Sequence, residues 1–111
     1  MLIASRSLKL KTTAQVVDIG IRLFAPVQAS DGSWLCRYEI DWPEGMLVME
    51  VAGIDAMQAI VVALQMIGSE IYTSNYHKAG QLSWDSHTRG YGFPIASSLR
   101  DLMVGDDEKF L

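Results

Sequence analysis

The side chains best suited to catalysis gather late in the chain, in a stretch rich in serine, aspartate and histidine. This stretch supplies the residue types of a hydrolase triad: Ser83, Asp85, Ser86 and His87. Residues this close together at the end of a strand rarely converge as a triad, and no glycine-flanked nucleophile elbow is present. We therefore do not expect nucleophilic catalysis from this stretch.

A metal site built from His77, Asp85 and His87 is a second interpretation of the same region. Their spacing matches no zinc pattern, and a single cysteine, Cys36, rules out a thiolate cluster. Cys36 is itself expected to be a buried structural thiol, because a nucleophile needs a nearby base and an electropositive setting. No local signature supplies the base or the electropositive setting. We expect no metal and no cofactor.

Aromatic side chains outside regular elements are the better candidates for contacts. Trp42 and Tyr91 fall at predicted turn or loop positions, where exposed rings are typical anchors for a protein partner. The residues that we expect to contact a ligand or partner are Trp42, Trp84, Asp85, His87 and Tyr91.

The element that must position these groups is a helix expected from about Ala56 to about Tyr76. Asp55 is its expected N-cap, because the carboxylate can accept from N–H groups of the first turn. The alternative is that this helix start holds an anion or ligand, with help from Gln58. Apolar residues at helical spacing predict the core-facing side: Met57, Ile60, Val61, Leu64, Ile67, Gly68 and Ile71. The apolar surface extends more than halfway round, so the helix could also present a face to a partner subunit.

Four segments before the helix alternate apolar and polar residues, which predicts β-strands at 3–12, 16–24, 34–40 and 46–51. Short turns containing Asp31-Gly32 and Pro43-Glu44-Gly45 connect them. Connections this short favour an antiparallel meander, and its apolar face needs the helix as a cover. A short fifth strand is expected at 81–85.

The expected fold is therefore α+β. It is a mainly antiparallel sheet of four to five strands in the order β-β-β-β-α-β, with one long helix packed across one face. A short C-terminal helix starting at Ser97 or Ser98 is an option. Residues 1–104 are expected to form a single domain, and residues 105–111 an acidic flexible tail that frays.

Composition narrows the class of partner. Half of the 111 residues are hydrophobic and a fifth are charged, as in an ordinary globular domain. The net charge is −4 and basic residues do not cluster, which disfavours nucleic acid and anionic membranes. The apolar helix falls short of a membrane span. With no signal peptide and one cysteine, we expect a cytoplasmic protein.

Several short motifs resemble those of one known family. They are Trp34-x-Cys36, Gly53-x-Asp55-Ala56-x-Gln58-Ala59, Leu82-x-Trp84 and Gly92-Phe93-Pro94. With these motifs the chain, from residue 3 to about 95, is similar to a family of small uncharacterised bacterial domains, filed as a domain of unknown function. The helix-opening motif is the most specific part. The resemblance implies a stand-alone bacterial domain and carries no catalytic role.

Two classes of function remain. The preferred one is a non-enzymatic protein-interaction module, such as an immunity-like or regulatory partner, because no charged residues recur at a spacing that catalysis requires. An open sheet edge and a broad apolar helix also favour a homodimer. The alternative is a small-ligand-binding or enzymatic domain with its site near the loop from Ser86 to Gly92, where His87, Asp85 and Tyr91 would converge.

Overall fold

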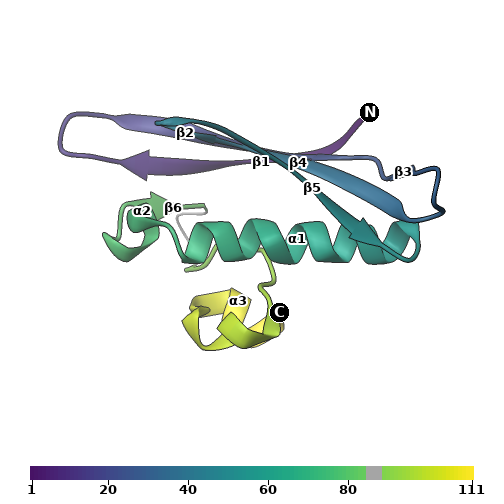
Figure 1. Cartoon of the computed structure of the whole chain (residues 1–111). Helices are drawn as coiled ribbons and strands as arrows, with labels where there is room; N and C mark the ends of the chain where they lie inside the picture. The colour runs from purple at the N-terminus through teal and green to yellow at the C-terminus, as the bar shows by residue number, and fades with distance from the viewer. Residues whose placement is uncertain (85–88) are drawn as a thin grey trace.

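The computed structural model of this protein describes residues 1–84 and 89–111. It consists of one antiparallel sheet, a long helix along one face of that sheet, and small C-terminal helices on the far side of the long helix (Figure 1). The strands are β1 (Leu2–Lys11), β2 (Val16–Phe24), β3 (Val27–Gln28), β4 (Trp34–Trp42), β5 (Gly45–Gly53) and β6 (Leu82–Ser83). The helices are α1 (Ala56–Tyr72), α2 (Asn75–Lys78), the 3₁₀ helix η1 (Ser97–Leu102) and α3 (Gly105–Phe110).

The sheet runs in the order β6-β1-β2-β4-β5, with β3 beside β4 on the side that β2 occupies. Pro26 separates β2 from β3, because proline has no N–H to give to a ladder. All pairings are antiparallel, as expected for short turns. The strand β5 pairs with β4 along its whole length and forms one edge of the sheet. At the other edge, β6 covers β1 only at Lys9 and Leu10.

The predicted α+β fold and its antiparallel sheet are confirmed, and the strand count differs. The structure has six strands among the described residues, where four to five were predicted. The strand β6 lies within the predicted fifth strand at 81–85, and β3 is the strand that the sequence did not predict; each is only two residues long. A two-residue segment such as β3 carries no readable alternation, so the sequence pattern detects it poorly.

The long helix begins where the sequence predicts and ends earlier. Asp55 is the N-cap, and its Oδ1 accepts from the Gln58 N–H at 2.8 Å. The expectation that α1 reaches about Tyr76 is wrong, because α1 ends at Tyr72 and Ser74 caps the separate helix α2. The Ser74 hydroxyl donates to a carbonyl of the last turn of α1 and accepts from the His77 N–H. Side-chain bonds of this kind compete with continued helix.

The side of α1 that faces the sheet is made of smaller residues than predicted. Ala59, Ala63 and Ile67 are fully buried, whereas Met57 is 78% exposed and Val61 is 50% exposed. The prediction was correct for Ile67, Gly68 and Ile71, which are buried, and wrong for Met57 and Val61. Alanine brings the helix axis close to the sheet, and the bulk of the core comes instead from the facing strands.

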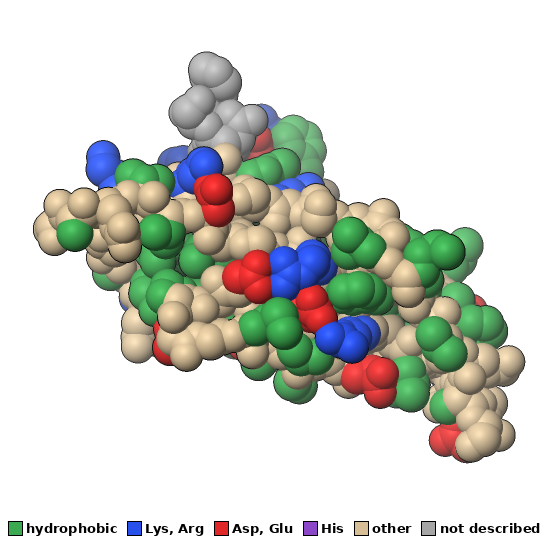
Figure 2. All heavy atoms as spheres, turned by 90° about the horizontal axis from the view of Figure 1, so that it is seen from above, with side chains coloured by type: hydrophobic (Ala, Val, Ile, Leu, Met, Phe, Trp, Pro, Cys, Tyr) green, Lys and Arg blue, Asp and Glu red, His purple; other side chains and the backbone are tan. Residues whose placement is uncertain are grey.

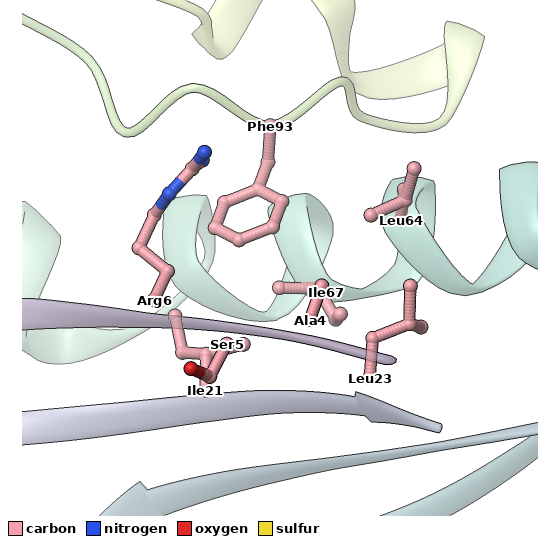
Figure 3. A pocket seen from close by; sticks show the side chains of 8 residues that line it. All are labelled: Ala4, Ser5, Arg6, Ile21, Leu23, Leu64, Ile67 and Phe93. Carbon is pink, nitrogen blue, oxygen red and sulfur yellow. The ribbon is translucent and has the colours of Figure 1, made fainter. Parts of the chain in front are cut away.

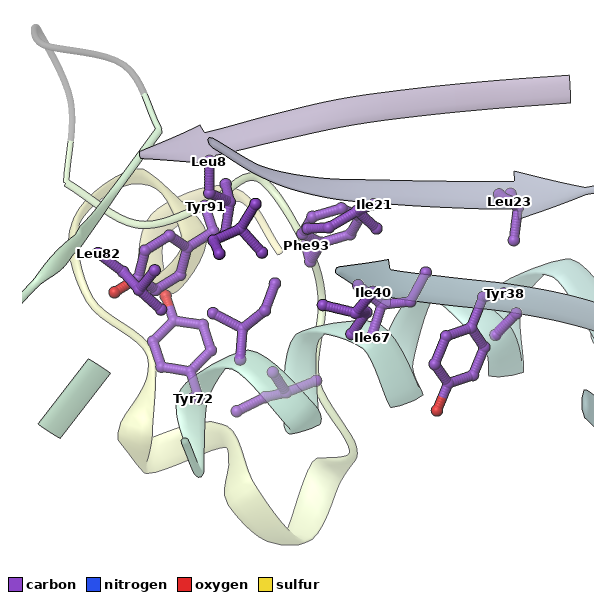
Figure 4. Packing of buried hydrophobic residues seen from close by; sticks show 14 of the residues in the cluster. Leu8, Ile21, Leu23, Tyr38, Ile40, Ile67, Tyr72, Leu82, Tyr91 and Phe93 are labelled. Atoms are coloured by element: carbon purple, nitrogen blue, oxygen red, sulfur yellow. The ribbon is translucent and has the colours of Figure 1, made fainter. Parts of the chain in front are cut away.

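The core lies between the sheet and α1 and continues under the C-terminal segment (Figure 4). That segment crosses α1 at Gly68, where a Cβ atom would lie 1.8 Å from the Pro94 carbonyl oxygen. The expected acidic tail is instead the helix α3, and its Asp107 is only 2% exposed. This carboxylate accepts hydrogen bonds from Tyr72, Tyr91 and Gly92.

Candidate functional site

The β5 edge, which we define as the strand Gly45–Gly53, is a long edge of the sheet whose outer side has no strand partner among the described residues. None of its residues is buried, and Val48 and Met49 are about two-fifths exposed, at 43% and 39%. Six of its residues are apolar and its one charge is that of Glu50. Among the described residues, no second strand pairs with it. A long apolar edge without lysine or proline can pair with a strand of another chain.

A hollow opens at the Gly45 end of this edge. This Trp42 hollow has a volume of about 580 Å³ and lies between the β4–β5 hairpin and the junction of α1 with α2. Its walls include Trp42, Glu44, Leu47, Glu70, Thr73 and Tyr76. These residues belong to the β4–β5 hairpin and to the α1–α2 junction, and none belongs to β1 or β2. The hollow is therefore on the side of α1 nearest the β5 edge.

Aromatic stacking and two carboxylates give this hollow its character. The rings of Trp42 and Tyr76 stack with centroids 5.5 Å apart at an angle of 21°. The Tyr76 hydroxyl donates to Glu44 Oε2 at 2.6 Å, and this bond raises the pKa of Tyr76. Burial, and then the charge of Glu70, raise the pKa of Tyr38 to about 12. The hollow is thus lined by two carboxylates and an aromatic wall.

The outer face of the sheet carries a charged network at its centre (Figure 2). Arg22 donates to Glu39 at 2.8 Å and to both carboxylate oxygens of Asp41 at 2.7 and 2.6 Å. Arg37 also pairs with Glu39. Hydrogen bonds from Arg22 lower the pKa of Glu39 and of Asp41. Because these charges satisfy one another, the apolar side chains of β5 are the more available part of the molecule for binding.

A narrow groove beside β1 is a third surface (Figure 3). It has a volume of about 100 Å³ and is mostly apolar, with Arg6 at one end. The Arg6 guanidinium lies 4.0 Å from the centre of the Trp84 ring and 4.7 Å from that of Phe93. It also donates to the Tyr91 and Gly92 carbonyls at 2.9 and 3.0 Å. Through these bonds, Arg6 holds the C-terminal segment against β1. Burial lowers the pKa of Arg6.

Tyr91 is the centre of a buried polar cluster. Its hydroxyl lies 2.5 Å from His77 Nδ1, and its N–H donates to Asp107. Asp107 also accepts from the Gly92 N–H at 2.7 Å and from the Tyr72 hydroxyl at 2.7 Å. Burial lowers the pKa of His77 and raises that of Tyr91 to about 12. Figure 4 shows Tyr72 and Tyr91 pointing toward each other beneath β1.

The residues predicted to make contacts meet different fates. Trp42 lines the hollow, and Trp84 is 39% exposed but covered on one face by Arg6. Tyr91 is only 4% exposed, so its predicted role as an exposed anchor is wrong. Asp85 and His87 lie outside the described residues, and so does their predicted convergence with Tyr91.

The thiol and the metal hypotheses can be compared with the structure in part. Cys36 is fully buried, its Sγ lies 3.3 Å from the Phe24 carbonyl oxygen, and burial raises its pKa. This is the setting of an unreactive structural thiol. Within residues 1–84 and 89–111, no group of three His, Cys, Asp or Glu side chains is placed to hold a metal ion.

Sequence reasoning missed two sets of site residues. Glu44 and Glu70 beside Trp42 are one set, and Asp107 beside Tyr91 is the other. Glu70 carried a usable signal, because it is the one charged residue in the sequence of α1. Asp107 carried none, since an acidic residue near a chain end resembles an ordinary solvated tail.

Comparison with known proteins gives a family and no activity. A family model described as "Domain of unknown function (DUF6968)" matches residues 4–95. The chain belongs to this family. No curated protein and no solved structure matches it. The DUF6968 match covers the sheet, α1 and the Phe93–Ile95 crossing, whereas η1 and α3 lie beyond its end. Among the described residues, no helix of this DUF6968 protein is long and apolar enough to cross a membrane.

Proposed function

We propose that this protein is a non-enzymatic interaction module that binds an extended segment of a protein partner along the β5 edge. The observation that carries the proposal is that β5 has nine residues, none of them buried, with a neighbour on one side only among the described residues. Unpaired backbone groups of an edge strand can form a ladder with a partner's strand, and alternate side chains then add specificity.

The side chains of β5 support this mode of binding. Met46 and Val48 lie on the outer face and are 54% and 43% exposed, while Met49 on the inner face is 39% exposed. A strand added beside β5 would cover apolar atoms on both faces at once. Burial of this kind stabilises a complex by roughly 25 cal/mol per Å² of apolar surface before the costs of association.

A second copy of the chain is one partner class that this edge accommodates. An antiparallel two-fold pairing of β5 about Met49 would place Leu47 opposite the second copy's Val51, so that apolar residues meet apolar residues on the face toward α1, while Val48 would lie opposite Glu50 on the outer face. Isologous contacts of this kind are the commonest in homodimers. The family resemblance supports a bacterial module, and a single cysteine, which leaves the chain without an internal disulfide, supports a cytoplasmic one.

A photo-crosslinking amino acid at position 48 tests the proposal in the protein's native host. We expect a crosslink from this position to a partner protein or to a second copy, identified by mass spectrometry. The matched control is position 16 on β2, where another valine is 57% exposed. Crosslinks from position 16 but none from position 48 would contradict the assignment of the β5 edge.

A ligand-binding site beside Tyr91 is the second candidate function. A hollow of about 450 Å³ is lined there by His77, Arg89 and Tyr91, among others. The close contact between His77 Nδ1 and the Tyr91 hydroxyl is the specific observation in its favour. Titration with small carboxylates and phosphates, monitored by the NMR signals of His77, distinguishes a ligand site from the interaction module. Saturable shifts of the His77 signals would support the ligand site.

A further inference from the structure

The β5 edge and the Trp42 hollow form one continuous surface. Leu47 belongs to both, because it lies in β5 and lines the hollow. The hollow lies at the Gly45 end of the strand, next to the turn that connects β4 and β5. A segment laid along β5 would therefore pass its end over the hollow.

The side chains that line the Trp42 hollow carry negative charge, which suits the binding of a cation. Glu44 and Glu70 line it, and none of the described residues that line it is basic. The stacked rings of Trp42 and Tyr76 supply an aromatic wall, and a ring face attracts a cation placed within about 6 Å of its centre. Its volume of about 580 Å³ is ample for one long side chain.

We infer that the partner of the β5 edge is an extended segment of another protein whose lysine or arginine side chain enters the Trp42 hollow. This inference rests on the proposed function, since it names the chemistry of the partner that β5 would bind. The aliphatic part of the basic side chain would lie against Leu47, and its charged end would lie between the Glu44 and Glu70 carboxylates.

A second copy of the chain does not bring a basic side chain to this hollow. In a two-fold pairing of β5, the Gly53 end of the second copy would lie over this hollow. The described surface at that end is lined by Gly32, Ser33, Ala52, Gly53, Ile54 and Gln58. None of these side chains is charged, so a second copy would bring no cation to Glu44 and Glu70.

The position of the hollow fixes where an antiparallel partner carries its basic residue. A strand antiparallel to β5 has its C-terminal end near Gly45, because β5 runs from Gly45 to Gly53. The basic residue of an antiparallel partner therefore belongs near the C-terminal end of its extended segment. The same residue at the N-terminal end would lie beside Gly53, outside the hollow.

Three synthetic peptides test the inference with the full chain. Each is a soluble nine-residue strand of alternating threonine and valine: one carries lysine near its C-terminus, one carries it near its N-terminus, and one carries norleucine in place of lysine. Two-dimensional NMR titration follows the amide signals of β5 and the indole signal of Trp42. We expect the C-terminal lysine peptide to bind roughly three- to tenfold more tightly than the other two.

Variants then assign the effect to the carboxylates. In the double variant Glu44→Gln and Glu70→Gln, the preference for the C-terminal lysine should disappear while the β5 amides still shift. The matched control is Glu108→Gln, which removes an exposed carboxylate from α3, outside the hollow, and should leave the preference intact. Amide spectra of each variant establish that the fold is retained.

The possible outcomes separate this inference from the proposed function. Equal binding of all three peptides at β5 would overturn the basic-side-chain inference and leave strand binding in place. No shift of β5 amides with any peptide at millimolar concentration would overturn both. A stable dimer in light scattering that Val48→Lys dissolves would assign the edge to a second copy and so also overturn the inference.

Discussion

At the scale of single residues, Asp107 is a buried side chain with three hydrogen bonds to lose. It accepts from the Tyr72 hydroxyl and from the N–H groups of Tyr91 and Gly92, all at 2.7 to 2.8 Å. Asp107→Asn keeps the shape but turns one acceptor into a donor facing these donors. The free energy of unfolding should fall by about 1–3 kcal/mol, measured by chemical denaturation.

The control for this prediction lies one residue away. Asp106 is exposed and belongs to the same turn of α3, so Asp106→Asn should change the stability by less than about 0.5 kcal/mol. Equal losses in the two variants would mean that charge near the start of α3 matters, and that the buried hydrogen bonds of Asp107 do not.

His77 provides a prediction about pH. Burial lowers its pKa in the folded protein, so the unfolded chain binds a proton to this residue more readily. The contribution of neutral His77 to stability is present above the unfolded value of about 6.5 and is lost as the pH falls below it. NMR titration of the His77 ring should give a midpoint below about 6.5; a higher midpoint would contradict the buried environment.

Residue roles were predictable where the interaction is local. The N-cap role of Asp55 depends on Gln58, three positions along the chain, and the sequence predicts it correctly. The burial of Tyr91 depends on His77 and Asp107, which lie 14 and 16 positions away. Only the folded chain brings these groups together, so a loop tyrosine flanked by glycines was mistaken for an exposed anchor.

At the scale of elements, the sequence predicts that α1 is a helix but does not predict which side of it faces the sheet. The period of the apolar residues identifies a helix, but apolar residues occupy too wide an arc to fix which side faces the sheet. Close packing settles it, because Ala59 and Ala63 fit against β4 and β5 where larger residues would hold the helix away.

This rotation predicts unequal costs for two truncations on α1. Ile67→Ala should lower the free energy of unfolding by about 2–5 kcal/mol, because Ile67 is fully buried. Met57→Ala should cost less than about 0.5 kcal/mol, because that side chain is 78% exposed. Denaturant titration of both variants measures the difference, and equal costs would refute the orientation of the helix.

At the scale of the whole molecule, the C-terminal residues decide where the domain ends. The sequence predicts a domain of residues 1–104, and the family match already ends at residue 95. In the structure, Asp107 of α3 accepts hydrogen bonds from the Tyr72 hydroxyl and the Tyr91 N–H. A chain that ends after Val104 would leave these buried donors without their acceptor.

Removal of residues 105–111 should therefore destabilise the protein by about 2–5 kcal/mol, more than Asp107→Asn alone. The larger loss is expected because the deletion removes all of the acceptor oxygens together with the helix that shields them. Hydrogen exchange of the Tyr91 and Gly92 amides should accelerate in the truncated protein, since Asp107 is their acceptor. The amides of β4 serve as the internal reference, because their partners in β5 remain. Unchanged stability with unchanged exchange would establish that the domain ends at residue 104 and that α3 is an appendage.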